Sequence, residues 1–374
     1  MRILHSYKVY GPEFEGGIPY VIATLTGQHA ADLDNRILVA RKKGLSKKYQ
    51  LDGVPVEAVT SLGTLFSTPL APSFPFKLIN RAEHCDIVVH HAPFPLADLA
   101  LYRLPPDVAL VVYWHADIVG FPLLKSIVKP ATVKTLQRAD RIIVADQSTI
   151  ANSHLLHAFA YKCTVIPYGT DVERWSDCTE SEIMESNSLR QKHPRLILGI
   201  GRLVTYKGFA VLLEALREID GHLVLIGEGP LATKLETLAD DFGTSGKVTF
   251  AGRLPSATVK AYLHAARVLA FPSVTTAEAF GIVQLEAMAA GLPIVNTALA
   301  TAVPRVARHE QEALTVAPNN PKALAEALRR ILDNPCLAER LGRAGKARAT
   351  LEYGESTYVR RVRNVYEGLL PNRK

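Results

Sequence analysis

Short β-branched apolar runs alternate with helical patterns along the whole chain, and the alternation occurs twice. In the first half the runs are MRILHSY, NRILVAR, CDIVVHHA, ALVVYWHAD, RIIVADQS and TVIPYG. In the second half they are RLILGIGR, HLVLIGEG, KVTFAG, RVLAFPSV, LPIVNTA and ALTVAP. Nearly continuous apolar strands separated by helices are typical of parallel sheets covered on both faces. The sequence therefore predicts an α/β protein with two doubly wound, Rossmann-like domains in tandem.

A polar, acid-rich stretch separates the two halves. With 374 residues the chain is long for one hydrophobic core and sufficient for two. We predict an N-terminal domain over 1–170, a linker over 171–194 and a C-terminal domain over 195–352. Doubly wound sheets bind ligands outside the carboxyl ends of their strands. Two such domains facing each other across a cleft suit a reaction of two substrates, because each domain can hold one of them.

Several classes of protein are excluded by what the sequence lacks. No apolar run approaches the ~18–20 residues that cross a bilayer. MRILHSY reads as a strand rather than a signal peptide, so we expect a cytoplasmic protein. The four cysteines have no C-x-x-C spacing, which argues against a zinc site and a disulfide framework.

The net charge of +7 comes from the second half of the chain, but the densest basic stretch lies in the first. Residues 36–51 hold six basic side chains and no acid. This stretch is either a solvated loop or a surface that binds anionic lipid head groups. Nucleic acid is not expected as a partner, because no aromatic residues interleave with the basic ones in a recognition motif. The basic, amphipathic stretch 121–138 has the same two interpretations, an ordinary domain helix or a membrane contact.

The segment PSVTTAEAFGIVQLEAMAAGLPIVNT, residues 272–297, carries two glutamates eight residues apart. If a helix begins near Gly281, the amides of Gly281, Ile282 and Val283 are unpaired donors that attract phosphate. Glu286 then lies about one turn into the helix, where it can hold a ribose diol, and Glu278 can reach a sugar beyond the diphosphate. The alternative is that both glutamates only cap the helix and interact with its dipole.

A second motif, GIGRLVTYKG at 199–208, places Arg202 and Lys207 just after a strand. Two fixed cations would stabilise the charge that develops on a diphosphate leaving group. A dinucleotide-binding G-x-G-x-x-G motif is incomplete here, because Val204 occupies the place of its third glycine. GEGP at 227–230 is a tight turn after the next strand and could border a base pocket.

Three motifs in this order and spacing resemble those of the retaining glycosyltransferases of family 4, which have the two-domain GT-B fold. The motifs are GRL-xx-xKG, G-x-GP and PS-xxxx-EAFGI-xxxx-EAMA-xGLPIV. The resemblance covers about 195–297. It implies that Arg202 and Lys207 bind the donor diphosphate and that Glu286 binds the ribose. It also implies that Glu278 and the 281–283 amides hold the donor sugar. No cofactor and no metal ion are expected, since side chains neutralise the phosphates of the nucleotide-sugar.

The first half resembles the family more loosely. EGGIPYVIATL at 15–25 is similar to the family's glycine loop, in which Gly17 would touch the donor and Gly16 the acceptor. YWHAD at 113–117 is similar to the strand end whose histidine, His115, faces the reacting sugar, although a lone histidine is more often a core residue. Asp117 and His91 are further candidates for the acceptor side.

Two positions depart from the family pattern. Ala302 and Arg305 stand where glycine and glutamate are common, which leaves the donor sugar open. The pattern as a whole looks most like bacterial enzymes that build surface polysaccharides from GDP-mannose or a GDP-deoxyhexose. The expected acceptor is a growing lipid-linked glycan or polysaccharide, and the expected location is the inner face of the cytoplasmic membrane.

Other functions remain open on the sequence. The donor could be a UDP-sugar, and the chain could instead be a nucleotide-sugar epimerase or a non-catalytic subunit of a glycan assembly complex. YGESTYVRRVRNVYEGLL at 353–370 reads as a helix. In the family such a helix packs back on the first domain, so we expect 353–374 to do so here.

Overall fold

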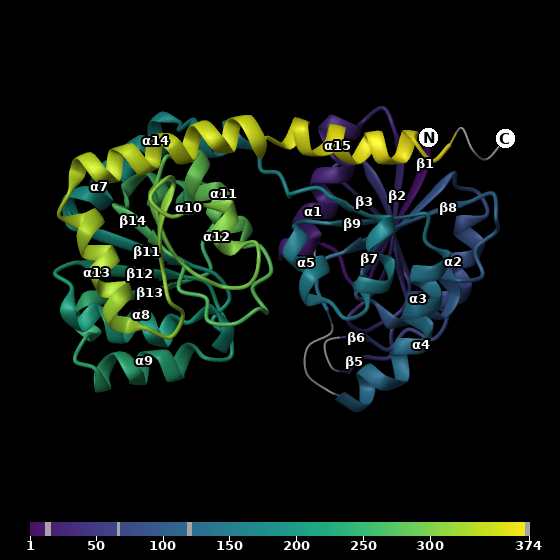
Figure 1. The fold of residues 1–374 in the computed structure, drawn as a ribbon, viewed down its shortest axis with the longest axis horizontal. Helices are drawn as coiled ribbons and strands as arrows, with labels where there is room; N and C mark the ends of the chain where they lie inside the picture. The colour runs from purple at the N-terminus through teal and green to yellow at the C-terminus, as the bar shows by residue number, and fades with distance from the viewer. Residues whose placement is uncertain (12–15, 66–67, 118–121, 371–374) are drawn as a thin grey trace. The chain divides into compact units, whose positions relative to one another are not determined.

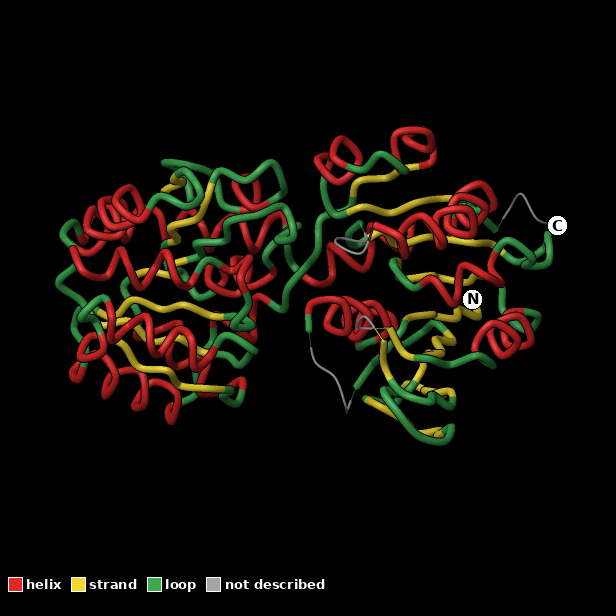
Figure 2. Tube along the Cα trace, turned by 90° about the horizontal axis from the view of Figure 1, so that it is seen from below, coloured by secondary structure: helices red, strands yellow, loops and turns green. Residues whose placement is uncertain are grey.

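The structure is a computed structural model that describes residues 1–11, 16–65, 68–117 and 122–370, without the side chains of 122–125. The chain forms two compact units. Unit 1 consists of Met1–Gly169 together with Glu355–Lys374, and unit 2 is Thr170–Gly354. In each unit the strands lie between helices (Figures 1 and 2). This confirms the predicted α/β architecture of two Rossmann-like domains.

Unit 1 is built on an eight-stranded sheet of order β10-β9-β8-β7-β1-β2-β4-β3, which is parallel except for the edge strand β3. A separate hairpin of β5 and β6 lies outside this sheet. The central strands β7 and β8 are buried at every position, which explains their continuous apolar sequences. The strands are β1 (Arg2–Tyr7), β2 (Asp34–Ala40), β3 (Lys47–Leu51), β4 (Val54–Val59), β5 (Thr64–Leu65), β6 (Thr68–Pro69), β7 (Ile87–Ala92), β8 (Ala109–Trp114), β9 (Arg141–Val144) and β10 (Cys163–Val165).

Helices cover both faces of this sheet. One apolar cluster joins the sheet to α2, α3 and α4, and a second joins the other face to α1. The helices are α1 (Gly17–Thr26), η1 (Gln28–Ala30), α2 (Phe74–Ala82), α3 (Pro95–Leu101), α4 (Pro122–Arg138), α5 (Gln147–Asn152), η2 (Leu156–Lys162) and α15 (Glu355–Glu367). Helix α15 buries Tyr358, Val359, Val362 and Tyr366, and the Tyr358 hydroxyl lies 2.8 Å from that of Tyr113 on β8.

Unit 2 is built on a six-stranded, fully parallel sheet of order β13-β12-β11-β14-β15-β16. Its strands are β11 (Leu196–Ile200), β12 (His222–Ile226), β13 (Val248–Gly252), β14 (Val268–Ala270), β15 (Ile294–Thr297) and β16 (Ala313–Val316). Its helices are α6 (Val172–Ser176), α7 (Glu180–Lys192), η3 (Thr205–Lys207), α8 (Phe209–Ala215), η4 (Leu216–Glu218), α9 (Ala232–Asp241), η5 (Ser245–Lys247), α10 (Ser256–Ala265), α11 (Ile282–Ala289), α12 (Val303–Val306), α13 (Pro321–Leu332) and α14 (Pro335–Glu352).

The stretch 171–194, for which the sequence predicts a linker, is part of unit 2 and contains helices α6 and α7. Thr179 and Glu182 form a capping box that starts α7. The Glu182 carboxylate also pairs with Lys260 on α10 at 2.7 Å. The capping box thus fixes the start of α7, and the Glu182–Lys260 ion pair joins the helix to α10.

Helix α4 spans most of the stretch for which the sequence leaves a membrane contact open. Thr132, Thr135 and Leu136 in its second half are buried, and α4 packs against α3. Ile127 and Lys129 are exposed. The second half is therefore a domain helix, and a membrane contact of its first half stays a prediction.

Candidate active site

The two basic residues of GIGRLVTYKG lie on the loop that follows β11. Arg202 is exposed, and its guanidinium makes no hydrogen bond or ion pair within the part of the chain that the structure describes. Lys207 ends η3 and is followed by Gly208 in the left-handed conformation, with φ of 71°. A Cβ at Gly208 would lie 2.0 Å from the Pro272 carbonyl oxygen, so glycine lets this loop approach the segment after β14.

Lys207 and Glu278, which are 71 positions apart in the sequence, form a buried ion pair. The Lys207 Nζ lies 2.6 Å from the Glu278 Oε2, and their side chains are 11% and 10% exposed. The Ser273 hydroxyl donates to the same carboxylate oxygen at 3.1 Å. The structure thus places a predicted phosphate ligand and a predicted sugar ligand in direct contact, and each satisfies the charge of the other.

Helix α11 begins directly after Gly281, as the sequence predicts. Gly281 has φ of 81°, and a Cβ there would lie 2.6 Å from the Phe271 ring, so both backbone conformation and space require glycine. The amides of Ile282 and Val283 belong to the first turn, where no intrahelical acceptor exists. They lie at the positive end of the helix and can donate hydrogen bonds to an anion.

Glu286 lies one turn into α11, and its side chain is partly buried. Burial raises the pKa of its carboxyl from 4.5 to about 7, although the charges of Arg174 and Lys207 lower it. The effect of Lys207 shows that Glu286 is near the Lys207–Glu278 pair. Arg174, at the N-terminal end of unit 2, donates to the Ser256 hydroxyl at 2.7 Å and adds positive charge near Glu286, which the motifs do not reveal.

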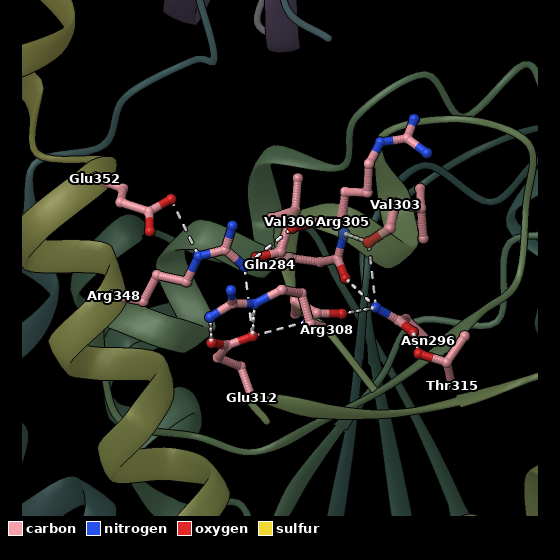
Figure 3. A network of polar contacts seen from close by, with 11 residues as sticks. Gln284, Asn296, Val303, Arg305, Val306, Arg308, Glu312, Thr315, Arg348 and Glu352 are labelled. Atoms are coloured by element: carbon pink, nitrogen blue, oxygen red, sulfur yellow. Dashed lines mark hydrogen bonds and ion pairs between the residues drawn. The ribbon is translucent and has the colours of Figure 1, made fainter. Parts of the chain in front are cut away.

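A buried amide pair, also missed by the sequence interpretation, connects this helix to the following loop (Figure 3). Gln284 on α11 and Asn296 on β15 are both fully buried and bonded to each other at 2.9 Å. Gln284 Nε2 also donates to the Phe280 carbonyl, beside Gly281, and to the Val303 carbonyl of α12. The Asn296 amide nitrogen donates to the carbonyls of Val303 and Ala307. The glycine turn and α12 are therefore held at fixed positions relative to each other.

The two positions that depart from the family pattern lie in the segment that this pair holds. Ala302 is buried in ordinary helical conformation, and its amide donates to the Ala279 carbonyl beside Glu278 at 3.0 Å. Its backbone therefore does not require glycine. The Arg305 side chain is exposed and extends away from the Arg308–Glu312–Arg348 cluster in Figure 3. Arg348 holds the end of α12 by donating to the carbonyls of Arg305 and Val306, both at 3.0 Å.

In unit 1, the predicted residues His91 and His115 belong to a hydrogen-bonded chain of three buried histidines. His5 Nδ1 lies 3.1 Å from His91 Nε2, and His91 Nδ1 lies 2.9 Å from His115 Nε2. His115 Nδ1 lies 2.6 Å from the Tyr168 hydroxyl. Burial lowers the pKa of His5 to about 4 and that of His115 to about 3, and it also lowers the pKa of His91. All three imidazoles are therefore neutral near pH 7.

Each neutral imidazole carries one proton, so the hydrogen bonds that link the three histidines all run in the same direction. Either each ring donates toward Tyr168, or the Tyr168 hydroxyl donates to His115 and each ring donates toward His5. His5 Nε2 and Asn35 Oδ1 are both buried and have no hydrogen-bond partner among the described residues. Both ring nitrogens of His115 are thus engaged within unit 1.

The remaining candidates of unit 1 lie apart from this chain. Asp117 Oδ1 accepts from the Trp114 indole at 2.9 Å and from the Ser153 hydroxyl at 2.8 Å, and Asp117 lines a small pocket with Asp98. Burial raises the pKa of Asp98 to about 7. Gly16 and Gly17 are exposed at the start of α1. Residues 12–15 of the predicted glycine loop lie outside the described residues.

Two further observations concern metal sites and membrane-spanning helices. Across the described ranges, no group of three or more His, Cys, Asp or Glu side chains has the arrangement of a metal site. Within the same ranges, no helix combines the length and the apolarity that crossing a membrane requires.

Comparisons with known proteins match both halves of the chain. A family model described as "Glycosyltransferase Family 4" matches residues 15–174, and one described as "Glycosyl transferases group 1" matches residues 180–348. The D-rhamnosyltransferase WbpZ of Pseudomonas aeruginosa is 31% identical over 350 residues, which cover 93% of this chain and 91% of that protein. The O-antigen chain mannosyltransferase C of Escherichia coli is 28% identical over 385 residues and covers 100% of both chains.

More distant relatives and solved structures agree. A GDP-mannose-dependent phosphatidylinositol monomannoside mannosyltransferase of Mycobacterium tuberculosis is 28% identical over 303 residues, with 77% of each chain covered. The crystal structure of Anabaena HepE in complex with UDP superposes with a TM-score of 0.78 at 20% identity, covering 99% of this chain and 100% of that one. The chain therefore belongs to glycosyltransferase family 4, with the GT-B fold, and is a hexosyltransferase related to the mannosyl- and rhamnosyltransferases of bacterial surface polysaccharides.

Proposed function

We propose that this enzyme transfers a mannose-type hexose from a GDP-linked donor to a growing lipid-linked or polysaccharide glycan, with retention of the anomeric configuration and without a metal ion. The observation that carries the proposal is the convergence of Lys207, Glu278 and the Gly281 turn in unit 2. A cation, a carboxylate and unpaired helix amides together match a diphosphate joined to a sugar.

The donor phosphates contact Arg202, Lys207 and the amides of Ile282 and Val283. Arg202 is exposed and uncommitted within the described chain, and Lys207 can exchange Glu278 for a phosphate oxygen. Glu278, released from Lys207, turns to the hydroxyls of the sugar. Glu286 accepts hydrogen bonds from the ribose diol. Two positive side chains and a helix N-terminus offset the phosphate charge, which is the role that a metal ion has in other transferases.

Retention follows from attack on the same face as the leaving group. The bond between the sugar C1 and the diphosphate oxygen breaks as the acceptor oxygen bonds to C1, and the acceptor proton passes to the leaving diphosphate. His115 faces the sugar as a neutral ring and exchanges no proton with it, because both its ring nitrogens are engaged and its pKa is lowered to about 3. Gly17 contacts the donor, and Gly16 and Asp117 mark the acceptor side. His91 is buried and bonded through both ring nitrogens to His5 and His115, so it supports His115 rather than contacting the acceptor.

The activities of the relatives favour a GDP-linked donor and a surface glycan. Rhamnosyl- and mannosyltransferases are among the proteins most similar over nearly the whole chain, and one further relative is named as GDP-mannose-dependent. A UDP-sugar is the second candidate, since the HepE structure contains UDP. We further propose that the enzyme acts in the cytoplasm at the inner face of the membrane, where a lipid-linked acceptor would be located.

A thermal-shift screen of nucleotides and nucleotide-sugars tests the donor. A ligand that binds only the folded protein raises its stability by RT ln(1 + [L]/Kd), so GDP and GDP-mannose should stabilise far more than UDP and UDP-glucose. The reverse order would replace the GDP proposal with the UDP alternative. NMR of the product reports the anomeric configuration. Turnover with a chelator tests the need for a metal, and a changed sugar after incubation with donor alone would indicate an epimerase.

A further inference from the structure

The Lys207–Glu278 ion pair joins two side chains that would bind different parts of the donor. Lys207 is the proposed ligand of the diphosphate, and Glu278 is the proposed ligand of the sugar. The 2.6 Å contact between two side chains that are only 11% and 10% exposed makes each the main partner of the other. A ligand that takes Lys207 therefore removes the counter-ion of Glu278, and its affinity depends on what it offers Glu278 in return.

Lys207 is held in place by its surroundings. A Cβ on Gly201 would lie 3.1 Å from the Lys207 Cε, so the lysine stem packs on the backbone of that glycine. The Nζ lies 5.0 Å from the centre of the Phe271 ring and 5.7 Å from that of the Tyr206 ring. Cations are attracted to aromatic rings at such distances. The ammonium group can therefore keep its position while its anionic partner changes, and Glu278 is the member of the pair that moves.

Glu278 has little besides Lys207 to satisfy its charge. The Ser273 hydroxyl donates to Oε2 at 3.1 Å, and the carboxylate makes no other hydrogen bond or ion pair with the described residues. A buried carboxylate that keeps only one hydrogen bond from a neutral hydroxyl is unfavourable. Separation of Glu278 from Lys207 therefore costs free energy unless new donors reach the carboxylate.

A second ion pair of unit 2 is fixed more firmly. The Glu182 carboxylate, which pairs with Lys260, also accepts from the Thr179 amide at 2.8 Å. Lys260 also donates to a backbone carbonyl at 2.9 Å. In the part of the chain that the structure describes, no backbone group bonds to the Lys207 ammonium or to the Glu278 carboxylate. The Lys207–Glu278 pair is therefore the one that a ligand can open.

A nucleoside diphosphate and a nucleotide-sugar differ in what they bring to Glu278. Both place phosphate oxygens at Lys207, and their negative charge repels the nearby carboxylate. Only the nucleotide-sugar adds hydroxyl groups that donate hydrogen bonds to Glu278. The diphosphate alone leaves the carboxylate beside like charge without a new donor, whereas the sugar hydroxyls offset this cost.

We propose that the Lys207–Glu278 pair makes the enzyme bind the sugar-bearing donor in preference to its own nucleoside diphosphate product, and thereby promotes release of that product. Once the sugar has moved to the acceptor, Glu278 loses the hydroxyls that it bound, returns to Lys207 and displaces the diphosphate. Ser273 keeps the carboxylate within reach of both partners. The inference rests on the proposed function, because it takes the diphosphate to bind Lys207 and the sugar to bind Glu278.

Titration of the full chain with GDP and GDP-mannose, and with UDP and UDP-glucose in parallel, tests the proposal in four variants. Glu278→Gln removes the charge that repels the phosphates. Ser273→Ala keeps both charges and removes the hydrogen bond to the carboxylate. Glu182→Gln is the control, because it opens the other buried ion pair of the unit, and Lys207→Met tests the phosphate site itself. Calorimetry measures the affinities, and stopped-flow fluorescence of a labelled diphosphate measures its dissociation rate.

We expect the wild type to bind GDP-mannose about tenfold more tightly than GDP, which is the size of effect that hydrogen bonds to a charged group produce. Glu278→Gln should bind GDP about tenfold more tightly than the wild type and release it about tenfold more slowly, without a gain for GDP-mannose. Ser273→Ala should weaken GDP about threefold more than GDP-mannose, because the released carboxylate loses its one hydrogen bond. Glu182→Gln should keep both affinities.

GDP binding by Glu278→Gln that is no tighter than in the wild type would overturn the proposal, as would an equal gain in Glu182→Gln. If Glu278→Gln does not fold, an unchanged preference for GDP-mannose in Ser273→Ala overturns it. Loss of GDP binding in Lys207→Met without a gain in Glu278→Gln contradicts only the release mechanism. GDP binding that persists in Lys207→Met contradicts the proposed donor site. The same comparisons apply to UDP and UDP-glucose if these are the ligands that bind, and absence of binding by all four contradicts both proposals.

Discussion

The Lys207–Glu278 pair can be tested against a second ion pair of the same unit. Lys260 and Glu182 lie 2.7 Å apart and are each 10% exposed, which matches the distance and burial of Lys207 and Glu278. Removing one partner leaves an unpaired buried charge, so Lys207→Met and Lys260→Met should each cost about 3 kcal/mol of unfolding free energy. Only Lys207→Met should also weaken donor binding, by about a hundredfold. Chemical denaturation and calorimetric titration measure the two effects.

If Lys260→Met weakened donor binding as much as Lys207→Met, the loss would report general destabilisation. Unchanged turnover in Lys207→Met would remove that residue from the site. Glu278→Gln, which keeps the shape of the side chain, should retain nucleotide binding and lose sugar transfer. Its product yield with saturating donor separates the role of Glu278 from that of Lys207.

Glu286 makes donor binding depend on pH. Burial raises the pKa of its carboxyl to about 7, so the free protein holds the protonated form below that pH. The carboxylate accepts the ribose hydroxyls, and donor affinity should therefore fall as pH decreases, by about tenfold between pH 8 and pH 6. Glu286→Gln should bind more weakly at pH 8 and lose this part of the pH dependence. Titration of GDP at a series of pH values provides the comparison, and an unaltered slope in the variant would assign the proton to another group.

At the residue scale, the sequence could predict which candidate residues lie close together where they belong to one loop or one helix turn. Glu286 follows Gly281 by five positions on a single helix, so spacing alone predicts their proximity. The histidine chain is different. His5 lies on β1, His91 lies on β7, and His115 directly follows β8. They meet only because these three strands are neighbours in the sheet. No local pattern specifies strand order, so the contacts of His5 and Tyr168 were not predictable.

At the scale of elements, the start of α11 depends on one glycine. Gly281→Ala would combine a positive φ with a Cβ 2.6 Å from the Phe271 ring. Gly243 is a matched control, since it has φ of 67° and nothing within 4 Å of a built Cβ. We expect Gly243→Ala to cost about 1 kcal/mol from backbone conformation alone, and Gly281→Ala about 3 kcal/mol. Donor titration should show a loss of affinity only for Gly281→Ala, and equal behaviour of the two variants would contradict a role for close packing.

The buried amide pair gives a second prediction at this scale. Asn296→Asp replaces a nitrogen that donates to the Val303 and Ala307 carbonyls by an oxygen that repels them. The expected cost is about 3 kcal/mol, together with weaker donor binding, because α12 loses its tie to the Gly281 turn. Thr315→Val removes the hydroxyl that donates to Asn296 Oδ1 at 2.7 Å but keeps both carbonyl contacts, so it should bind the donor normally. Denaturation curves and donor titration of both variants test this, and normal donor binding by Asn296→Asp would show that the tie does not matter for the site.

The sequence did not predict the helices and strands whose buried residues are polar or few. Helix α7 buries only Glu182 and Ser186, so its sequence reads as a polar stretch, and a linker was predicted there. The edge strand β3 is exposed or half-exposed at all five positions and has no apolar alternation. The central strands of both sheets are enclosed by helices on both faces, and their apolar runs were recognised. The fold class could therefore be read from the buried elements, while the edges and α7 could not.

At the scale of the whole molecule, unit 1 is discontinuous in sequence, because it takes α15 from the end of the chain. Helix α15 buries four side chains, and the Tyr358 hydroxyl contacts that of Tyr113 in the core. Arg363 pairs with Asp32 on the same unit. Gly169 also packs on Tyr358, since a Cβ at Gly169 would lie 2.6 Å from the Cβ of Tyr358. Unit 1 is therefore incomplete without the last residues, whereas unit 2 is a continuous segment.

Truncation after Gly354 should accordingly unfold or strongly destabilise unit 1 and leave unit 2 intact. Burial of one large side chain contributes ~1.5–3 kcal/mol, so the loss of four removes an amount comparable to the whole stability of a typical domain. Calorimetry of the truncated chain should show one transition instead of two, and GDP should still raise the temperature of the one that remains. Truncation after Leu370 is the control, because it keeps α15 and should preserve both transitions. Loss of GDP stabilisation on truncation after Gly354 alone would mean that nucleotide binding depends on unit 1 as well, contrary to the donor site proposed in unit 2.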